Sequence, residues 1–350
     1  MEENSKKNPI ILGIESSCDE TAAAIVCGRK ILSDEIASSA DIQALYGGVV
    51  PEIASRAHTD AIAAVVERAV KNAGITYQDI DAVAVTYGAG LLGALLVGVS
   101  FAKAFAYALH KPLIAVNHIR GHLAAAYLDE PTLHPPFITL LASGGHTAIL
   151  HTKTETEFEL LGGTLDDAVG EAFDKVARVL GLPYPGGPHI ERAAKEGKNV
   201  IPMPKMLKGN GGYNFSYSGL KTAVINYCHT CTQRGEEYSK ADVAASFQSA
   251  AINVLVEKTV FAAKGRGVYA VTAGGGVAAN GYLREQLARA CEKNGLRLVL
   301  PEKRYCTDNA AMIAAEGVTQ YKQGNFADLR LTAKASLSLS MTLKTEQNGK

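Results

Sequence analysis

Two stretches decide the fold, because the chain begins in the same way twice. The first is IILGIESS (residues 10–17), an apolar run that enters a small polar turn before residues 21–26 become apolar again. The second is FITLLASGGH (residues 137–146), which is followed by the largely apolar residues 147–151. Two such runs around a polar or glycine-rich tip are typical of a β-hairpin. The sequence therefore predicts a hairpin at the start of each half.

Helix-like and strand-like segments alternate after each hairpin. The strand-like runs lie at 82–86, 113–116, 268–272 and 296–300, and the helix-like segments at 53–72, 166–180 and 242–264. Such alternation predicts α/β layering with helices packed on sheets. We therefore predict two related α/β domains that face a cleft, the plan of the actin, sugar-kinase and Hsp70 ATPase group. In that group the hairpin tips hold nucleotide phosphates.

The proline-rich segment 129–136 separates the two halves and reads as a linker. We place the first lobe at 9–132 together with a C-terminal segment of about 308–345, and the second lobe at 136–307. The segment 200–217 is rich in Pro, Lys, Gly and Asn and predicts an irregular surface excursion.

Composition limits the possible partners and the compartment. The 35 basic residues equal the 35 acidic ones, so nucleic-acid binding would need a local basic patch or a partner subunit. Trp is absent and six cysteines are scattered, which predicts no base-stacking platform and a reduced, cytoplasmic protein. Cys228 and Cys231 have redox-motif spacing, but without a second pair a structural role is favoured.

An uncharged stretch at 82–102 has the length of a membrane span. Five glycines and serines interrupt it, and Lys103 follows at once. A buried strand, a glycine turn and a buried helix explain this pattern better, so we predict no membrane segment.

Two histidines four residues apart, His118 and His122, follow the predicted strand 113–116. Asn117 is a suitable N-cap for a helix there, and this spacing places both rings on one face, where they suit a divalent metal. Zinc proteases carry Glu directly after the first His, and here that position is Ile119. Spacing alone leaves metal ligands and surface or capping histidines both open.

Asp308 comes after the last predicted strand and before a helix of small residues. Helix capping is one explanation for Thr307 and Asp308. As a third ligand, Asp308 would complete a set of two histidines and one carboxylate, which suits Fe(II) or Zn(II).

Two glycine turns lie in the second half of the chain. Ser143-Gly144-Gly145 forms the tip of the predicted hairpin, and Gly274-Gly275-Gly276 follows the predicted strand 268–272. Without Cβ atoms, their N–H groups can approach a phosphate closely. Asn280 either bonds a base or ribose or caps the next helix. Asp174, close to the turn at Gly186 and Gly187, is either a ribose acceptor or a solvated helix charge.

Together these motifs resemble the universal tRNA threonylcarbamoyladenosine transferase family, called TsaD in bacteria and formerly described as a sialoglycoprotein endopeptidase. The matching stretches run in order along nearly the whole chain: GIESSCDETA (13–22), GGVVPEIASRAH (47–58), VNHIRGH (116–122), LASGGHT (141–147), DDAVGEAFDKVAR (166–178), YPGGPHIE (184–191), FSYSGLKTA (215–223), GGGVAAN (274–280) and CTDNAAMIA (306–314). SGGHT and FSYSGLKTA are more similar to the bacterial branch.

The resemblance implies a duplicated actin-like fold (ASKHA, ribonuclease-H-like) with the active site between the lobes. It implies that His118, His122 and Asp308 hold one divalent metal, with Fe(II) favoured and Zn(II) possible. It also implies that the pocket for threonylcarbamoyl-AMP is lined by Leu141, Ala142, Ser143, Gly144, Gly145, Asp174, Gly187, Glu191 and Asn280. Glu191 departs from the family, which often has Asp there, and Ala89 stands where the family often has Pro.

The implied reaction transfers the threonylcarbamoyl group to the exocyclic amine of the adenosine 3′ to the anticodon, in tRNAs that read codons beginning with A. Asp19, in the first hairpin turn, is our candidate to position or deprotonate that amine; a turn-stabilising role is the alternative. Implied partners are tRNA, a paralogous actin-like subunit (TsaB), a small ATPase (TsaE) and a synthase that makes the adenylate. Lys205, Lys208 and Lys221 are candidates to contact tRNA.

Three other functions fit parts of this pattern. A small-molecule kinase of the same fold would use the glycine turns and Mg²⁺, but not a His-His-Asp set. A metalloprotease lacks its base after His118, and a non-catalytic nucleotide-binding scaffold would not need the histidines.

Overall fold

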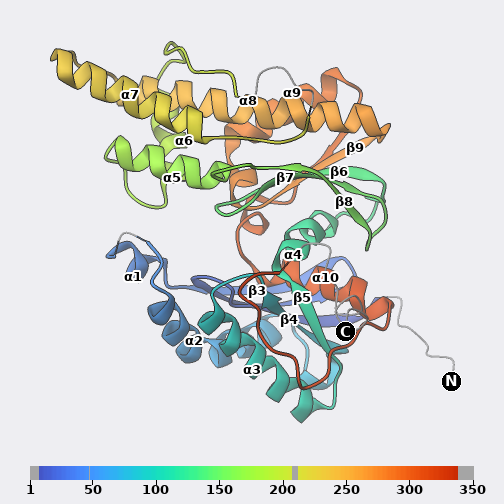
Figure 1. Ribbon diagram of the computed structural model, residues 1–350. Coiled ribbons are helices and arrows are strands. Elements are labelled where there is room, and N and C mark those ends of the chain that lie inside the picture. The colour runs from blue at the N-terminus through green and yellow to red at the C-terminus, as the bar shows by residue number, and fades with distance from the viewer. Residues whose placement is uncertain (1–7, 47, 207–211, 338–350) are drawn as a thin grey trace. The chain divides into compact units, whose positions relative to one another are not determined.

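The computed structural model describes residues 8–46, 48–206 and 212–337, and Figure 1 shows its ribbon. The chain divides into two compact units, one formed by Met1–Leu133 with Thr307–Lys350 and the other by His134–Cys306. In sequence, the second unit is inserted between two parts of the first. Each unit is built on a five-stranded sheet.

The sheet of the first unit has the order β3-β2-β1-β4-β5. Its strands are β1 (Ile10–Glu15), β2 (Glu20–Cys27), β3 (Lys30–Ser38), β4 (Ala82–Gly88) and β5 (Leu113–Asn117). β1 pairs antiparallel with β2, and β2 with β3, whereas β4 lies parallel to both β1 and β5. The predicted first hairpin is confirmed as β1 and β2.

The sheet of the second unit repeats this arrangement in the order β10-β9-β6-β7-β8. Its strands are β6 (Phe137–Ala142), β7 (Thr147–Thr152), β8 (Phe158–Gly163), β9 (Ala270–Gly274) and β10 (Arg297–Val299). The antiparallel pairs are β6–β7 and β7–β8, and the parallel pairs are β6–β9 and β9–β10. Two sheets with one strand order confirm the prediction of a duplicated α/β fold.

Helices connect and cover the strands of both sheets. The first unit contains α1 (Ala40–Ala44), α2 (Pro51–Asn72), α3 (Leu92–Leu109), α4 (His118–Ala124) and α10 (Ala310–Lys322). The second unit contains α5 (Val169–Val179), α6 (Gly186–Glu196), α7 (Ser218–Arg234), α8 (Lys240–Arg266) and α9 (Gly281–Lys293). Short 3₁₀ turns lie at Tyr77–Asp79, Ala125–Tyr127, Gly276–Ala279 and Lys303–Tyr305.

The alternating side chains of β1 face two different layers. Leu12 and Ile14 belong to the core that includes residues of α2 and α3. Gly13 lies on the other face against α10, where a Cβ atom would lie 2.3 Å from the carbonyl oxygen of Ala310. Since side chains alternate along a strand, α10 packs directly on the backbone of β1, opposite α2 and α3 (Figure 1).

Helix α3 is long and apolar enough to cross a membrane by length and composition alone, and 33% of its apolar window is buried. It joins β4 to the parallel strand β5 and packs on β4 and α2, as expected for a crossover helix. The sequence predicts a buried helix here. One face, with Leu95 and Val99, is buried as predicted, whereas Leu92, Leu96 and Tyr107 are exposed.

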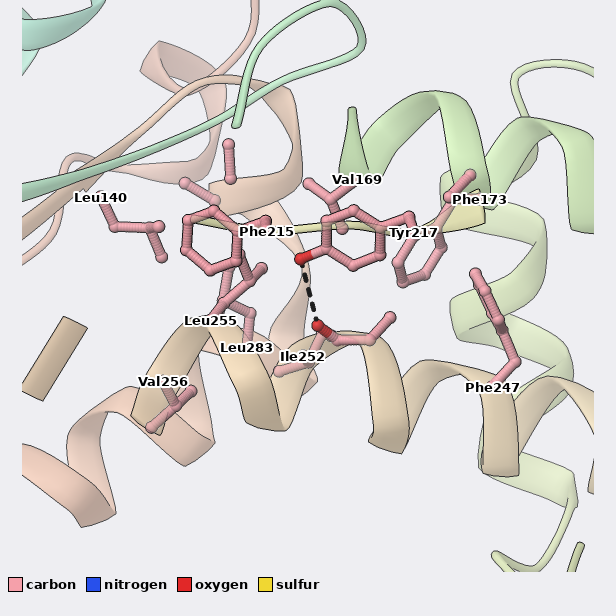
Figure 2. Close-up of a cluster of buried hydrophobic side chains, with 14 of the residues drawn as sticks. Leu140, Val169, Phe173, Phe215, Tyr217, Phe247, Ile252, Leu255, Val256 and Leu283 are labelled. Carbon is pink, nitrogen blue, oxygen red and sulfur yellow. Dashed lines mark hydrogen bonds between the residues drawn. The ribbon is translucent and has the colours of Figure 1, made fainter. Parts of the chain in front are cut away.

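The core of the second unit lies between its sheet and α5, α7, α8 and α9. Figure 2 shows Phe215 and Tyr217 side by side above Ile252 and Leu255 of α8. The hydroxyl of Tyr217 donates to the carbonyl oxygen of Ala251 at 3.5 Å, which pairs its one polar group inside the core. Cys228 and Cys231 are buried, free thiols of α7.

Two predicted helix boundaries were wrong. The helix predicted over 166–180 begins only at Val169, because the carboxylate of Asp166 instead accepts hydrogen bonds from the backbone N–H groups of Tyr217 and Ser218. The apolar run 123–128 predicts that the helix after Asn117 continues to residue 128, whereas α4 ends at Ala124 and a 3₁₀ turn follows. The described parts of the excursion 200–217 contain no helix or strand, apart from an isolated bridge between Phe215 and Thr164.

Candidate functional site

Helix α4 places two histidines on one face at the end of β5. The side chain of Asn117 accepts hydrogen bonds from the N–H of Ile119 at 2.9 Å and of Arg120 at 3.4 Å, so the helix begins at His118 as predicted. The rings of His118 and His122 lie 4.7 Å apart, centre to centre. Both side chains are largely buried, which argues against the alternative of two surface histidines.

Asp308 reaches the same point from the segment before α10. Its Oδ1 lies 3.5 Å from Nε2 of His118 and 3.3 Å from Nε2 of His122. The cap of α10 is Asn309, whose side chain accepts from the N–H of Met312, so capping does not explain the Asp308 carboxylate. One ligand atom from each of the three residues lies within 4.8 Å of the other two.

Glu15, at the end of β1, contacts Nδ1 of His118, whereas Asp308 lies at the other ring nitrogen. The Glu15 carboxylate is fully buried and lies 3.1 Å from Nδ1 of His118. It also accepts from the hydroxyl of Thr86 at 2.6 Å and from the N–H of Ser17 at 2.5 Å. Because an ionised carboxylate can only accept, Nδ1 of His118 carries the proton and donates it. The sequence offered one signal for this role, a lone carboxylate at the end of an apolar strand.

The site favours positive charge. Burial alone would lower the pKa of His118, but the carboxylates of Asp308 and Glu15 outweigh it and raise that pKa well above its ordinary value. Burial would raise the pKa of Asp308, and the two histidines instead hold it well below its usual range. Burial raises the pKa of the Cys18 thiol, and Asp19 raises it further, so this nearby cysteine stays neutral and is a poor metal ligand.

The donor set fits a divalent transition metal. With Nδ1 of His118 donating to Glu15, Nε2 is the ring nitrogen that faces Asp308. A divalent cation among the two Nε2 atoms and the Asp308 carboxylate would take the place of the proton that the raised pKa of His118 holds there. Two nitrogens and one carboxylate, with a carboxylate behind one histidine, are typical of Fe(II) and Zn(II) sites.

Asp19 lies in the turn between β1 and β2. Its carbonyl oxygen accepts from the N–H and the hydroxyl of Ser39, at 3.0 and 2.9 Å, which ties the turn to the residue before α1. Burial, together with a hydrogen bond to Asp19 and the charge of Asp19, raises the pKa of the neighbouring Glu20 to about 9. At neutral pH the pair therefore holds a proton on Glu20.

In the second unit, the two glycine turns lie next to each other. Leu141 and Gly274 are partners in the parallel pairing of β6 and β9, so the turns that follow share one edge of the sheet. Gly275 has a φ of +89°, and a Cβ atom there would lie 2.5 Å from the carbonyl oxygen of Ala142. Gly144 and Gly145, in contrast, face open space at the hairpin tip. Leu141 and Ala142 are buried in β6, and Ser143 closes the tip by hydrogen bonds with His146.

The predicted nucleoside contacts form a chain of bonds across α5, α6 and α9. The carboxylate of Asp174 accepts from the N–H of Gly186 at 2.7 Å. Burial raises the pKa of Asp174, and the N–H groups of Gly186 and Gly187 act against this. Glu191 accepts from the N–H of Gly281 at 3.1 Å, and Gly187 faces open space.

Of the two alternatives for Asn280, the structure shows helix capping, at the start of α9. The side-chain oxygen of Asn280 accepts from the N–H of Leu283 and its amide donates to Gln248, both at 2.9 Å. Both polar groups of this side chain are therefore engaged within the protein. Among the lysine candidates, Lys221 pairs with Asp167 at 2.8 Å, Lys205 is exposed, and Lys208 lies outside the described residues.

The sequence model of the tRNA N6-adenosine threonylcarbamoyltransferase family matches residues 30–315. The chain belongs to this family. A tRNA N6-adenosine threonylcarbamoyltransferase from Clostridium perfringens is 52% identical over 332 residues, which cover 94% of this chain and 98% of the relative. The one from Caldicellulosiruptor bescii is 51% identical over 334 residues, with the same coverage.

Two solved structures of HypF have the same fold. HypF from T. kodakarensis superposes with a TM-score of 0.62 at 15% identity, over 94% of this chain and 49% of HypF. Full-length HypF in the phosphate- and nucleotide-bound form superposes with a TM-score of 0.60 at 16% identity, over 93% of this chain and 48% of that chain. At this identity the likeness shows the fold alone.

Proposed function

We propose that this chain transfers the threonylcarbamoyl group from threonylcarbamoyl-AMP to the exocyclic amine of the adenosine 3′ to the anticodon, in tRNAs that read codons beginning with A. The observation that carries the proposal is the match to threonylcarbamoyltransferases at about half identity along nearly the whole chain. The meeting of His118, His122 and Asp308 supports it, because the kinase alternative has no use for such a set.

The amine of the tRNA adenosine would attack threonylcarbamoyl-AMP directly. Threonylcarbamoyl-AMP is a mixed anhydride, so its leaving group is already activated and no covalent enzyme intermediate is needed. The amine nitrogen forms a bond to the carbamoyl carbon, the bond from that carbon to the phosphate oxygen breaks, and AMP leaves. The amine loses one proton. Asp19 is the proposed group that positions the amine or accepts this proton.

His118, His122 and Asp308 would hold one divalent metal ion, with Fe(II) favoured and Zn(II) possible. When bound, the ion supplies positive charge opposite the negative charge that develops on oxygen during the transfer. Glu15 fixes the ring of His118 so that Nε2 faces the metal position, and its burial keeps that ring from turning.

The second unit would bind the nucleotide part of the substrate. The N–H groups at Gly144 and Gly145 can approach a phosphate, because no side chain covers the two glycines. The N–H of Ser143 would first have to leave the carbonyl oxygen of His146. Leu141 and Ala142 set the position of this tip from within β6. Asp174, Gly187, Glu191 and Asn280 are the proposed nucleoside contacts. Asp174, Glu191 and Asn280 would have to exchange present hydrogen bonds for substrate.

The proposed partners are tRNA, a paralogous actin-like subunit (TsaB), a small ATPase (TsaE) and the synthase that supplies threonylcarbamoyl-AMP, all acting in the cytoplasm. The equal numbers of acidic and basic residues support a tRNA surface that is shared among subunits.

The test is a reconstituted reaction. The purified chain, its partner subunits, threonylcarbamoyl-AMP and unmodified tRNA are incubated, and the nucleosides are measured by mass spectrometry. We expect threonylcarbamoyladenosine with the wild type and with His229→Ala, a substitution of an exposed histidine in α7. His118→Ala and Asp308→Ala should lose activity by about 100-fold or more.

The outcomes separate the two parts of the proposal. No product with competent partners and intact AMP binding would overturn the proposed reaction. Full activity of both His118→Ala and Asp308→Ala would leave the reaction standing and overturn the metal.

A further inference from the structure

Arg120 stands between the two histidines of α4 and takes part in a buried ion pair. Its Nε donates to Oε1 of Glu316 in α10 at 2.8 Å. Only 4% of the Arg120 side chain and 2% of the Glu316 side chain are exposed. Gln320, one turn further along α10, also donates to this oxygen, at 2.6 Å. Such a pair is costly to break, because a single substitution leaves a buried charge without its partner.

The pair lies on the opposite side of α4 from the metal donors. Arg120 is two residues from each histidine, which is a rotation of about 200° around a helix. Helix α4 has only seven residues, and those from Ile119 to Ala124 are all buried. The guanidinium of Arg120 is therefore placed where it can set the direction of both histidine rings.

The partner of Arg120 lies on the element that carries the third donor. Glu316 comes about two helical turns after Asp308, in the helix that Asn309 caps. The two helices also touch closely, since a Cβ atom at Gly121 would lie 2.7 Å from Cδ1 of Ile313. The ion pair thus joins the helix that bears two donors to the helix that directly follows the third.

We propose that Arg120 and Glu316 are positioning residues for the metal ligands. Their ion pair fixes the rotation of α4 against α10, so that Nε2 of His118 and of His122 both point at Asp308. This inference rests on the proposed function only in taking these three residues as the ligands. It assigns to Arg120 a task separate from metal binding itself.

The test measures Co²⁺ binding, whose visible absorption reports both affinity and ligand geometry. The main variant replaces both charges, Arg120→Met with Glu316→Leu, because a buried ion pair exchanged for apolar side chains leaves no unpaired charge. We expect this variant to keep a cooperative thermal unfolding transition, to bind Co²⁺ about tenfold more weakly or worse, and to change the absorption bands.

The matched control removes another ion pair of the same unit. Arg68 of α2 and Glu35 of β3 lie 3.5 Å apart, and neither helix α4 nor α10 takes part in that pair. Arg68→Met with Glu35→Leu should bind Co²⁺ with the affinity and spectrum of the wild type. Glu316→Gln, which keeps the size of the side chain and loses the charge, is the second variant if the main one fails to fold.

Each outcome decides the inference. Wild-type affinity and spectrum in the folded double variant, or in Glu316→Gln if only that variant folds, would overturn it and make the pair purely structural. If His118→Ala and Asp308→Ala bind Co²⁺ with the affinity of the wild type, the ligand set itself is overturned, and the inference with it. Weaker binding in the variant but not in the control supports the positioning role.

Discussion

The carboxylate of Glu15 lies 3.1 Å from Nδ1 of His118 and is fully buried behind the ring. The two residues are far apart in sequence and meet because β1 and β5 both border β4 in one sheet. Thr86 of β4, between them, donates to the same carboxylate oxygen. A hydrogen bond of this kind fixes which ring nitrogen carries the proton and which faces outward.

Glu15→Gln should weaken metal binding by about tenfold or more, because the amide oxygen can still accept from His118 but has lost its negative charge. Competition between the protein and a chromophoric chelator for Zn²⁺ measures this affinity. Thr86→Val is the control, since it removes one donor to Glu15 and leaves the carboxylate next to His118. Equal affinity of Glu15→Gln and the wild type would contradict a role for Glu15 behind this ligand.

Alanine at Gly144 should affect AMP binding and not stability, whereas alanine at Gly275 should lower stability. Gly144→Ala faces open space, so the thermal unfolding temperature should not change, whereas AMP affinity should fall about tenfold, the equivalent of one charge-assisted hydrogen bond. Gly275→Ala should lower the free energy of unfolding by about 1–3 kcal/mol, because its φ of +89° and the Ala142 carbonyl oxygen leave no room for a Cβ atom. Unchanged AMP binding in a folded Gly144→Ala variant would remove the hairpin tip from the phosphate site.

His58 should make the stability depend on pH. This fully buried ring lies 2.7 Å from the Thr21 hydroxyl oxygen and 3.0 Å from the Cys18 carbonyl oxygen. Burial lowers its pKa, and that carbonyl together with the charges of Glu15 and Asp19 offsets only part of this. The folded chain therefore binds this proton less readily than the unfolded chain.

The stability that His58 contributes is accordingly present above the unfolded pKa of about 6.5 and is lost as the pH falls through the lower, folded value. Urea unfolding at a series of pH values from 8 to 5 measures the effect. His58→Gln should be less stable than the wild type at pH 8 and should lose less stability toward pH 5. Parallel curves for the two proteins would show that another group titrates.

Asp166 should contribute to the stability of the second unit. Its carboxylate accepts from the N–H of Tyr217 at 2.7 Å and from the hydroxyl of Ser218 at 2.7 Å, where α7 begins. Asp166→Ala should cost about 1–2 kcal/mol of unfolding free energy, as expected for a lost helix cap. Asp328→Ala, which removes an exposed partner of Arg330, should be nearly neutral. Similar losses in both variants would mean that the cap contributes little.

The sequence was sufficient for the fold and for the placement of two of the three candidate metal ligands. The repeated hairpin start predicted two sheets of one kind, and His118 and His122 were placed on one helical face by spacing alone. Asp308 was joined to them only through the family resemblance, since no local pattern links residues so distant in the chain. The helix-cap alternative for Asp308 could be rejected only when Asn309 was seen to cap α10.

Tertiary contacts decided what the sequence left open. Asp166 reads as part of an amphipathic helix, yet its carboxylate binds residues about 50 positions later. Asn280 had two alternatives, and Gln248 of α8 takes up its amide. Arg120 carries no local sign that its partner is Glu316. In each case the partner is distant in sequence, where periodicity and capping rules give no information.

The packing of α10 on β1 has a consequence for the order of events during synthesis. His122 leaves the ribosome about 190 residues before Asp308, which corresponds to roughly 10–40 s at about 5–20 residues per second. Throughout that time the backbone at Gly13 lacks the helix that covers it. The second unit is continuous in sequence, so all its strands are available once Cys306 has been made. The half of the protein that is translated first is thus the half that is finished last.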